Sequence, residues 1–184
     1  MIQNRLEEYL RSTLTGRENL SMKEFRPIDQ GNSNQMARFV LSWRERETLE
    51  IRECILRMPT EKSIMAPYDP AREYLLLKAR QTSRVPVPSV LLMEEDHTVL
   101  GKSFLIMESV RGNSLSFSYH ALSPAGKRRL GGEYASTLAE IHSVDWKELS
   151  PFLKKIPADA TQFALAEVGE CKVRMRGIKG IPGI

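Results

Sequence analysis

Residues 104–112 read Phe-Leu-Ile-Met-Glu-Ser-Val-Arg-Gly, and the fold of the chain follows from this stretch. Four apolar residues, Phe104 to Met107, run without a break into Glu108, and a short polar connector closes on Gly112. An unbroken apolar run bounded by turn residues is typical of a strand buried on both faces. Because the connector leaves the sheet, its N–H and C=O groups need other partners. The stretch therefore predicts a central strand, followed by backbone that forms an ordinary turn or pairs with a flat heteroaromatic ring.

The composition is that of a globular protein. Of the 184 residues, 41% are apolar and 27% are charged, which fits one domain, or a small domain with part of a second. No apolar run approaches the roughly 20 residues of a membrane span, and the N-terminal residues lack a signal-peptide core. Cys54 and Cys171 are far apart, so we expect two reduced thiols in a cytoplasmic protein.

The net charge of +4 comes from the C-terminal tail. Past Glu170 the tail contains four basic residues and no acid: Lys172, Arg174, Arg176 and Lys179. Without them the chain is formally neutral, so the high pI is no sign of a nucleic-acid surface elsewhere. Binding of RNA or acidic lipid by the tail itself stays open. The glycines and proline of residues 169–184 predict a disordered tail without a clear element.

Periodicity predicts an α+β arrangement for the first 110 residues. The expected elements are an amphipathic helix over residues 2–14, an antiparallel hairpin over 25–58, a helix over 71–82, and strands over 89–93 and 99–110. Strand pairs separated by one helix indicate α+β rather than alternating βαβ. Residues 111–121 are polar and irregular. Ser123 and Pro124 then form a cap and helix start. A long helix is expected over 125–142, with an apolar stripe of Tyr134, Leu138 and Ile141, and a helical piece over 161–168.

Three features are candidates for binding an anion. Gly31, Asn32, Ser33 and Asn34 form a stretch that suits either a hairpin turn or a loop whose N–H groups contact phosphate. Arg57 closes the second hairpin strand, where its side chain either reaches into a cleft or is solvated. Glu73 lies in the first turn of the helix that Asp69 and Pro70 begin. An acid there stabilises the helix dipole, and it could also pair with Arg57.

Seven motifs in this order resemble the aminoglycoside phosphotransferase family of kinase-like enzymes, in particular the kinase-like domains fused to some acyl-CoA dehydrogenases. They are Gly31-Asn32-Ser33-Asn34, Ile55-Leu56-Arg57, Asp69-Pro70-Ala71-Arg72-Glu73-Tyr74, Val85-Pro86-Val87-Pro88, Leu100-Gly101, Phe104 to Glu108 with Gly112, and Leu138-Ala139-Glu140-Ile141-His142. They span about residues 1 to 150. The resemblance implies a kinase-like N-lobe with its leading helix over residues 1–110, a hinge and partial helical C-lobe over 111–168, and a basic tail over 169–184.

The resemblance also implies roles for individual residues. Gly31 to Asn34 would cover the nucleotide phosphates, and Arg57, in place of the family's strand lysine, would hold them while paired with Glu73. The Glu108 carbonyl and the Val110 N–H would face adenine, with Met107 at the back of the pocket. The implied cofactors are ATP and Mg²⁺, and the implied reaction is phosphorylation of a small-molecule hydroxyl.

One family motif is missing from these 184 residues. The family's catalytic loop reads His-Gly-Asp-x-x-x-x-Asn, and its Asp and Asn serve the acceptor hydroxyl and the magnesium ion. None of His97, His120 and His142 is followed by Gly-Asp. We therefore expect a chain truncated before the catalytic loop, inactive alone and without metal ligands. The alternative is a non-catalytic nucleotide-binding or scaffold module that pairs with a partner chain, or with itself, through the exposed lobe face.

Overall fold

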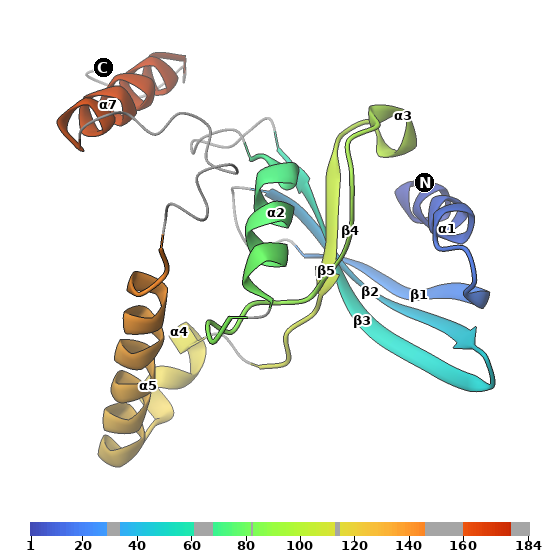
Figure 1. The fold of residues 1–184 in the computed structure, drawn as a ribbon, viewed down its shortest axis with the longest axis horizontal. Helices are drawn as coiled ribbons and strands as arrows, with labels where there is room; N and C mark the ends of the chain where they lie inside the picture. Colours follow the sequence, from blue (N-terminus) through green and yellow to red (C-terminus); the bar gives the residue numbers. More distant parts are fainter. Residues whose placement is uncertain (29–33, 61–67, 82, 113–114, 146–159, 178–184) are drawn as a thin grey trace.

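The computed structural model describes residues 1–28, 34–60, 68–81, 83–112, 115–145 and 160–177 (Figure 1). Its elements, in chain order, are α1 (Ile2–Thr13), β1 (Glu18–Ile28), β2 (Asn34–Glu45), β3 (Thr48–Pro59), α2 (Pro70–Arg80), β4 (Val90–Glu94), α3 (His97–Leu100), β5 (Phe104–Glu108), α4 (Leu115–Ser118), the 3-10 turn η1 (Tyr119–Ala121), α5 (Pro124–His142) and α7 (Ala160–Gly177). The α+β fold class predicted from the sequence is confirmed.

The strands form one antiparallel sheet in the order β1-β2-β3-β5-β4. β5, the strand of the opening stretch, lies between β3 and β4. The side chains of its first four residues, Phe104 to Met107, are all buried, and that of Glu108 is exposed. The prediction of a central strand buried on both faces is therefore confirmed.

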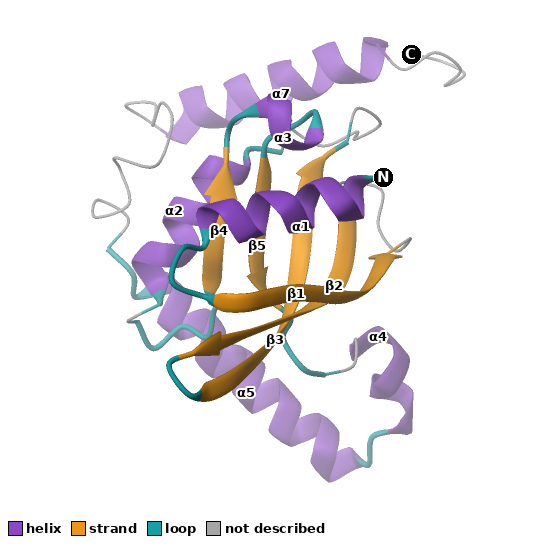
Figure 2. Cartoon of the chain, turned by 90° about the vertical axis from the view of Figure 1, so that its right-hand side faces the viewer, coloured by secondary structure: helices purple, strands orange, loops and turns teal. Residues whose placement is uncertain are grey.

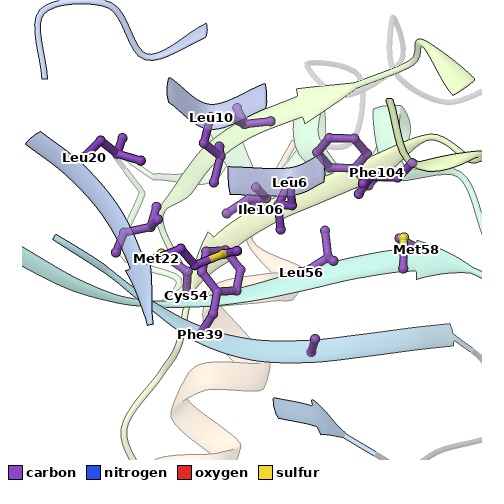
Figure 3. Close-up of a cluster of buried hydrophobic side chains, with 14 of the residues drawn as sticks. Leu6, Leu10, Leu20, Met22, Phe39, Cys54, Leu56, Met58, Phe104 and Ile106 are labelled. Atoms are coloured by element: carbon purple, nitrogen blue, oxygen red, sulfur yellow. The ribbon is translucent and has the colours of Figure 1, made fainter. Parts of the chain in front are cut away.

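The two faces of the sheet have different neighbours, α1 on one side and α2 on the other (Figures 1 and 2). In β3, Cys54, Leu56 and Met58 belong to the hydrophobic core, which also contains Leu6 and Leu10 of α1 (Figure 3). The intervening residues of β3 point to the opposite face, because side chains alternate along a strand. That second face carries Arg57 toward α2.

Helix α1 is held to the sheet by packing and by polar contacts at its edge. Leu6 and Leu10 are completely buried. The Tyr9 ring meets Phe104 edge-on, with centroids 5.6 Å apart and an interplanar angle of 83°, and its hydroxyl donates a hydrogen bond to Glu94. This hydrogen bond is the main reason that the pKa of the Glu94 carboxyl is lowered. The contacts confirm α1 as a packing element.

Both expected helix starts have the predicted caps. The Asp69 carboxylate accepts a hydrogen bond from the Arg72 N–H at 3.1 Å, with Pro70 as the first helical residue. The Ser123 hydroxyl accepts one from the Gly126 N–H, also at 3.1 Å, ahead of α5. A side-chain acceptor followed by Pro satisfies the exposed N–H groups of a helix start, so α2 and α5 begin where local chemistry places them.

The structure corrects several boundaries. β1 runs from Glu18 to Ile28, a strand that was not expected ahead of the two strands of the predicted hairpin. Two irregularities in its pairing with β2, near residues with left-handed backbone at Asn19 and Glu24 (φ 53° and 55°), break the alternation that would have revealed it. Ile51, expected among the apolar residues of its strand, is 62% exposed, because it lies on the face opposite the core.

Three further differences concern short or C-terminal elements. Residues 97–100 form the helix α3 where a turn and strand were expected, and residues 115–121 form α4 and η1 where the chain was expected to be irregular. α7 runs to Gly177, so the prediction of a patternless tail is wrong for residues 169–177. Residues 178–184 lie outside the described residues.

The two cysteines should differ sharply in reactivity. Cys171 is exposed, whereas Cys54 is buried in the core, and burial raises the pKa of its thiol to about 12. Because the thiolate is the reactive form, we expect one thiol per native chain to react with a disulfide reagent at pH 8, and the second only on unfolding. A Cys171→Ser variant should show no rapid reaction. Two rapidly reacting thiols would contradict the buried position of Cys54.

Candidate functional site

The connector after β5 is fixed on both sides where it leaves the sheet. The Glu108 N–H donates to the Ser89 carbonyl, and the Ser109 N–H donates to the Glu53 carbonyl, both at 2.8 Å. Gly112 has φ 152°, a backbone angle that L side chains rarely adopt, which accounts for glycine at the end of the connector. Glu108 and Ser109 are therefore held against Ser89 and the middle of β3, and the rest of the connector leads from β5 toward the helices that follow.

A cleft of about 740 Å³ lies beside this connector. It is lined by residues 51–54 of β3, residues 87–91 before and within β4, and residues 108–111 of the connector itself. Its apolar side chains include Ile51, Val87, Pro88, Leu91 and Val110. A mostly apolar cleft with a few polar backbone groups at one edge is the usual form of a site for a flat ring.

Arg57 and Glu73 meet on the opposite face of the sheet from the core. Arg57 Nη1 lies 2.6 Å from Glu73 Oε1, and the two side chains are 30% and 24% exposed. β3 positions the arginine and the first turn of α2 positions the carboxylate. The pairing expected between these two residues is confirmed, and it leaves a positive group held in one orientation near the end of β3.

The sequence analysis missed a third member of this cluster, Tyr68. The Arg57 guanidinium carbon lies 4.8 Å from the centroid of the Tyr68 ring. Burial, and next the neighbouring Glu73 carboxylate, raise the pKa of the Tyr68 hydroxyl far above its usual value. The Tyr68 hydroxyl and the Glu73 carboxylate interact electrostatically, but their geometry is not that of a hydrogen bond. The only sequence signal was an aromatic residue just before the Asp69-Pro70 helix start.

The cleft and the Arg57 guanidinium lie at different positions along β3. β3 contributes residues 51–54 to the cleft and Arg57 to the ion pair. Glu53 and Arg57 are four residues apart, or about 13 Å at the rise of a β-strand. A ring in the cleft and an anion at Arg57 could therefore belong to one elongated ligand lying along β3.

Glu53 links the connector to the sheet. Its carboxylate forms an ion pair with Arg38 of β2 and lies 3.9 Å from Arg111 of the connector, while its carbonyl accepts from Ser109. Arg111 is almost fully exposed, so its pairing contributes little. The sequence analysis did not identify Glu53 or Arg38 as site residues, because charged residues on an exposed strand face usually indicate only solvation.

The structure describes only some of the other predicted site residues, and only two of those line the cleft. Gly31, Asn32 and Ser33 lie outside the described residues, whereas Asn34 begins β2 opposite Pro59. Glu108 and Val110 line the cleft. Met107 is buried in β5, paired with Ile55 of β3, and is not among the described residues that line the cleft. The roles of all these residues toward a nucleotide remain predictions.

Two negative findings apply to the described part of the chain. It contains no group of three or more His, Cys, Asp or Glu side chains placed to hold a metal ion. None of its helices combines the length and apolar character needed to cross a bilayer.

Comparison with known proteins gives a consistent result. The family model described as "Phosphotransferase enzyme family" matches residues 24–175. The mouse (Mus musculus) protein acyl-CoA dehydrogenase family member 10 is 30% identical over 150 residues, which cover 80% of this chain and 13% of the relative. The rat (Rattus norvegicus) protein acyl-CoA dehydrogenase family member 11 is 35% identical over 75 residues, which cover 40% of this chain and 10% of the relative. The resemblance expected from the sequence is confirmed.

The fold also matches a solved structure. A Ralstonia eutropha JMP134 protein assigned as an aminoglycoside phosphotransferase superposes with a TM-score of 0.64 at 24% identity. The match covers 97% of this chain and 49% of that protein. This chain thus spans about half of the solved structure, and 13% and 10% of the two curated relatives.

The Arg57–Glu73 pair should contribute measurably to stability. We expect a coupling energy of about 1 kcal/mol from a double-mutant cycle of Arg57→Met and Glu73→Gln, since the pair is partly buried and hydrogen-bonded. Arg129 and Glu133 on α5, 3.6 Å apart and largely exposed, provide the matched cycle, in which less than about 0.5 kcal/mol is expected. Urea denaturation measures both. Equal coupling in the two cycles would show that the Arg57–Glu73 pair is no stronger than a surface contact.

Proposed function

This chain belongs to the phosphotransferase enzyme family, and from that membership we propose that it binds ATP along β3 and takes part in phosphorylating a small-molecule hydroxyl. The observation that carries the proposal is the arrangement of two features on one strand. The cleft beside Glu108 to Arg111 suits a purine ring, and Arg57, held by Glu73, suits the phosphates.

The proposed nucleotide contacts follow from the geometry of each group. Glu108 and Val110 line the cleft, and in the proposed complex the Glu108 carbonyl and the Val110 N–H would pair with the donor and acceptor along one edge of the purine. Arg57 is already oriented by Glu73, so it loses less conformational freedom on meeting phosphate than a free side chain would. Gly31 to Asn34, a stretch that ends on the first residue of β2, would cover the phosphates.

Phosphoryl transfer needs groups that these 184 residues do not supply. The sequence contains no His-Gly-Asp, and the described residues form no group of three or more His, Cys, Asp or Glu side chains placed to hold a metal ion. We therefore propose that this chain alone binds the nucleotide without transferring phosphate, and that the transfer belongs to a protein containing the remainder of the family fold. The acceptor hydroxyl, and the cytoplasmic location suggested by free thiols, remain predictions.

A second candidate function is a scaffold module that pairs with another chain. It is favoured by α5, where Tyr134, Leu138 and Ile141 form a stripe and are 69%, 39% and 48% exposed. An apolar stripe on a long helix normally packs against a neighbouring element. The two functions are compatible, because the stripe and Arg57 lie on different elements.

Nucleotide binding tests the first proposal. We expect ATP to bind more tightly than adenosine in isothermal titration calorimetry, because only ATP reaches Arg57. Arg57→Ala should weaken ATP binding about tenfold, roughly the contribution of one hydrogen bond to a charged group, and leave adenosine unchanged. Arg129→Ala, which removes an exposed arginine from α5, is the control. Absence of ATP binding to the wild-type chain at millimolar concentration would refute the proposal.

Self-association tests the second proposal, the scaffold function. We expect the mass measured by light scattering to rise with protein concentration, and Leu138→Glu to abolish that rise by placing a charge in the apolar stripe. Ser136→Glu adds the same charge on the other side of α5 and should have no effect. Arg57→Ala should leave association unaltered. A wild-type chain that stays monomeric at all concentrations would count against the scaffold function.

A further inference from the structure

The guanidinium of Arg57 is contacted from two directions by residues of one helix start. Its carbon lies 4.8 Å from the Tyr68 ring centroid, and its Nη1 lies 2.6 Å from Glu73 Oε1. The guanidinium lies over the Tyr68 ring, and its Nη1 donates a hydrogen bond to the Glu73 carboxylate. The two contacts restrict different motions, because a hydrogen bond alone leaves the guanidinium plane free to rotate about it.

We propose that Tyr68 is a positioning residue that holds the Arg57 guanidinium in the orientation that binds nucleotide phosphate. The inference rests on the proposed function, in which Arg57 meets the phosphates. Tyr68 itself need not touch the nucleotide. It acts through Arg57, by reducing the number of orientations that the guanidinium samples before the ligand arrives.

The start of α2 determines where both partners lie. The Asp69 carboxylate caps the helix through the Arg72 N–H, and the Asp69 carbonyl accepts from the Glu73 N–H at 3.2 Å. Tyr68 immediately precedes this cap and Glu73 lies in the first turn. The same turn of backbone therefore presents the ring and the carboxylate together, so both contacts to Arg57 depend on one local structure.

The contact also explains why arginine suits position 57. A guanidinium is planar, so it stacks on an aromatic face while its edge still donates hydrogen bonds, whereas a lysine ammonium is a compact point charge without a plane. The Tyr68 hydroxyl stays neutral at ordinary pH, since burial and the Glu73 carboxylate raise its pKa. The ring thus supports the cation without adding a second negative charge beside Glu73.

The test compares ATP with adenosine in calorimetric titrations of the whole chain. Tyr68→Leu removes the ring and should weaken ATP binding about fivefold, within the range of cation–π contacts, while adenosine binding stays unchanged. Tyr68→Phe keeps the ring and should bind ATP as the wild type does. The matched control is Tyr74→Leu, which removes the ring of the exposed Tyr74–Lys78 pair on α2 and should leave both ligands unaffected.

Arg57→Lys provides a second test that leaves Tyr68 in place. It should weaken ATP binding in the wild type by about fivefold, and have little further effect in Tyr68→Leu, because the stacking is then already lost. Unchanged ATP binding in Tyr68→Leu, or an equal loss for adenosine, would overturn the inference, as would Arg57→Lys binding ATP like the wild type. A wild-type chain that binds no ATP would refute the proposed function, and with it this role of Tyr68.

Discussion

The burial of β5 on both faces is the constraint on which the rest of the structure depends. Phe104 and Ile106 join the core beneath α1, while Leu105 and Met107 are buried on the other face. Such a strand has to lie inside the sheet, between β3 and β4, because an edge position would expose part of it to water. Once β5 is placed there, the chain must leave the sheet after Glu108, and the cleft forms at that exit.

A second constraint is local, and it acts at the start of α2. The Asp69 cap and Pro70 begin the helix independently of the sheet, and the turn that they stabilise carries Tyr68 and Glu73 to Arg57. The Arg57 side chain is therefore positioned by β3 and oriented by residues at the start of α2, the helix on that face of the sheet. A charged side chain held this way is organised before any ligand binds, which is the condition for efficient electrostatic recognition.

The sequence predicted features that depend on local pattern. Four apolar residues predicted β5, two Asp/Ser-Pro pairs predicted the starts of α2 and α5, and ordered family motifs predicted the Arg57–Glu73 pair. It did not predict features that depend on tertiary geometry or broken periodicity. The irregular pairing of β1 hid a strand beginning at Glu18, and Tyr68 had no recognisable pattern because its role arises only when β3 and α2 meet. A helical piece was expected over residues 161–168, but the continuation of α7 to Gly177 was missed because glycines suggested disorder.

In the proposed function, nucleotide binding and phosphoryl transfer depend on different groups of residues. The described groups proposed to bind ATP belong to the sheet, the connector and α2, and α2 packs on β3, β4 and β5. Phosphoryl transfer would require an acidic catalytic residue and metal ligands. In the family these groups belong to a motif that is absent from these 184 residues. Among the described residues, the apolar stripe of α5 is exposed. Under the proposed function, the nucleotide-binding groups are positioned by the sheet and α2, so their arrangement does not depend on what packs against α5.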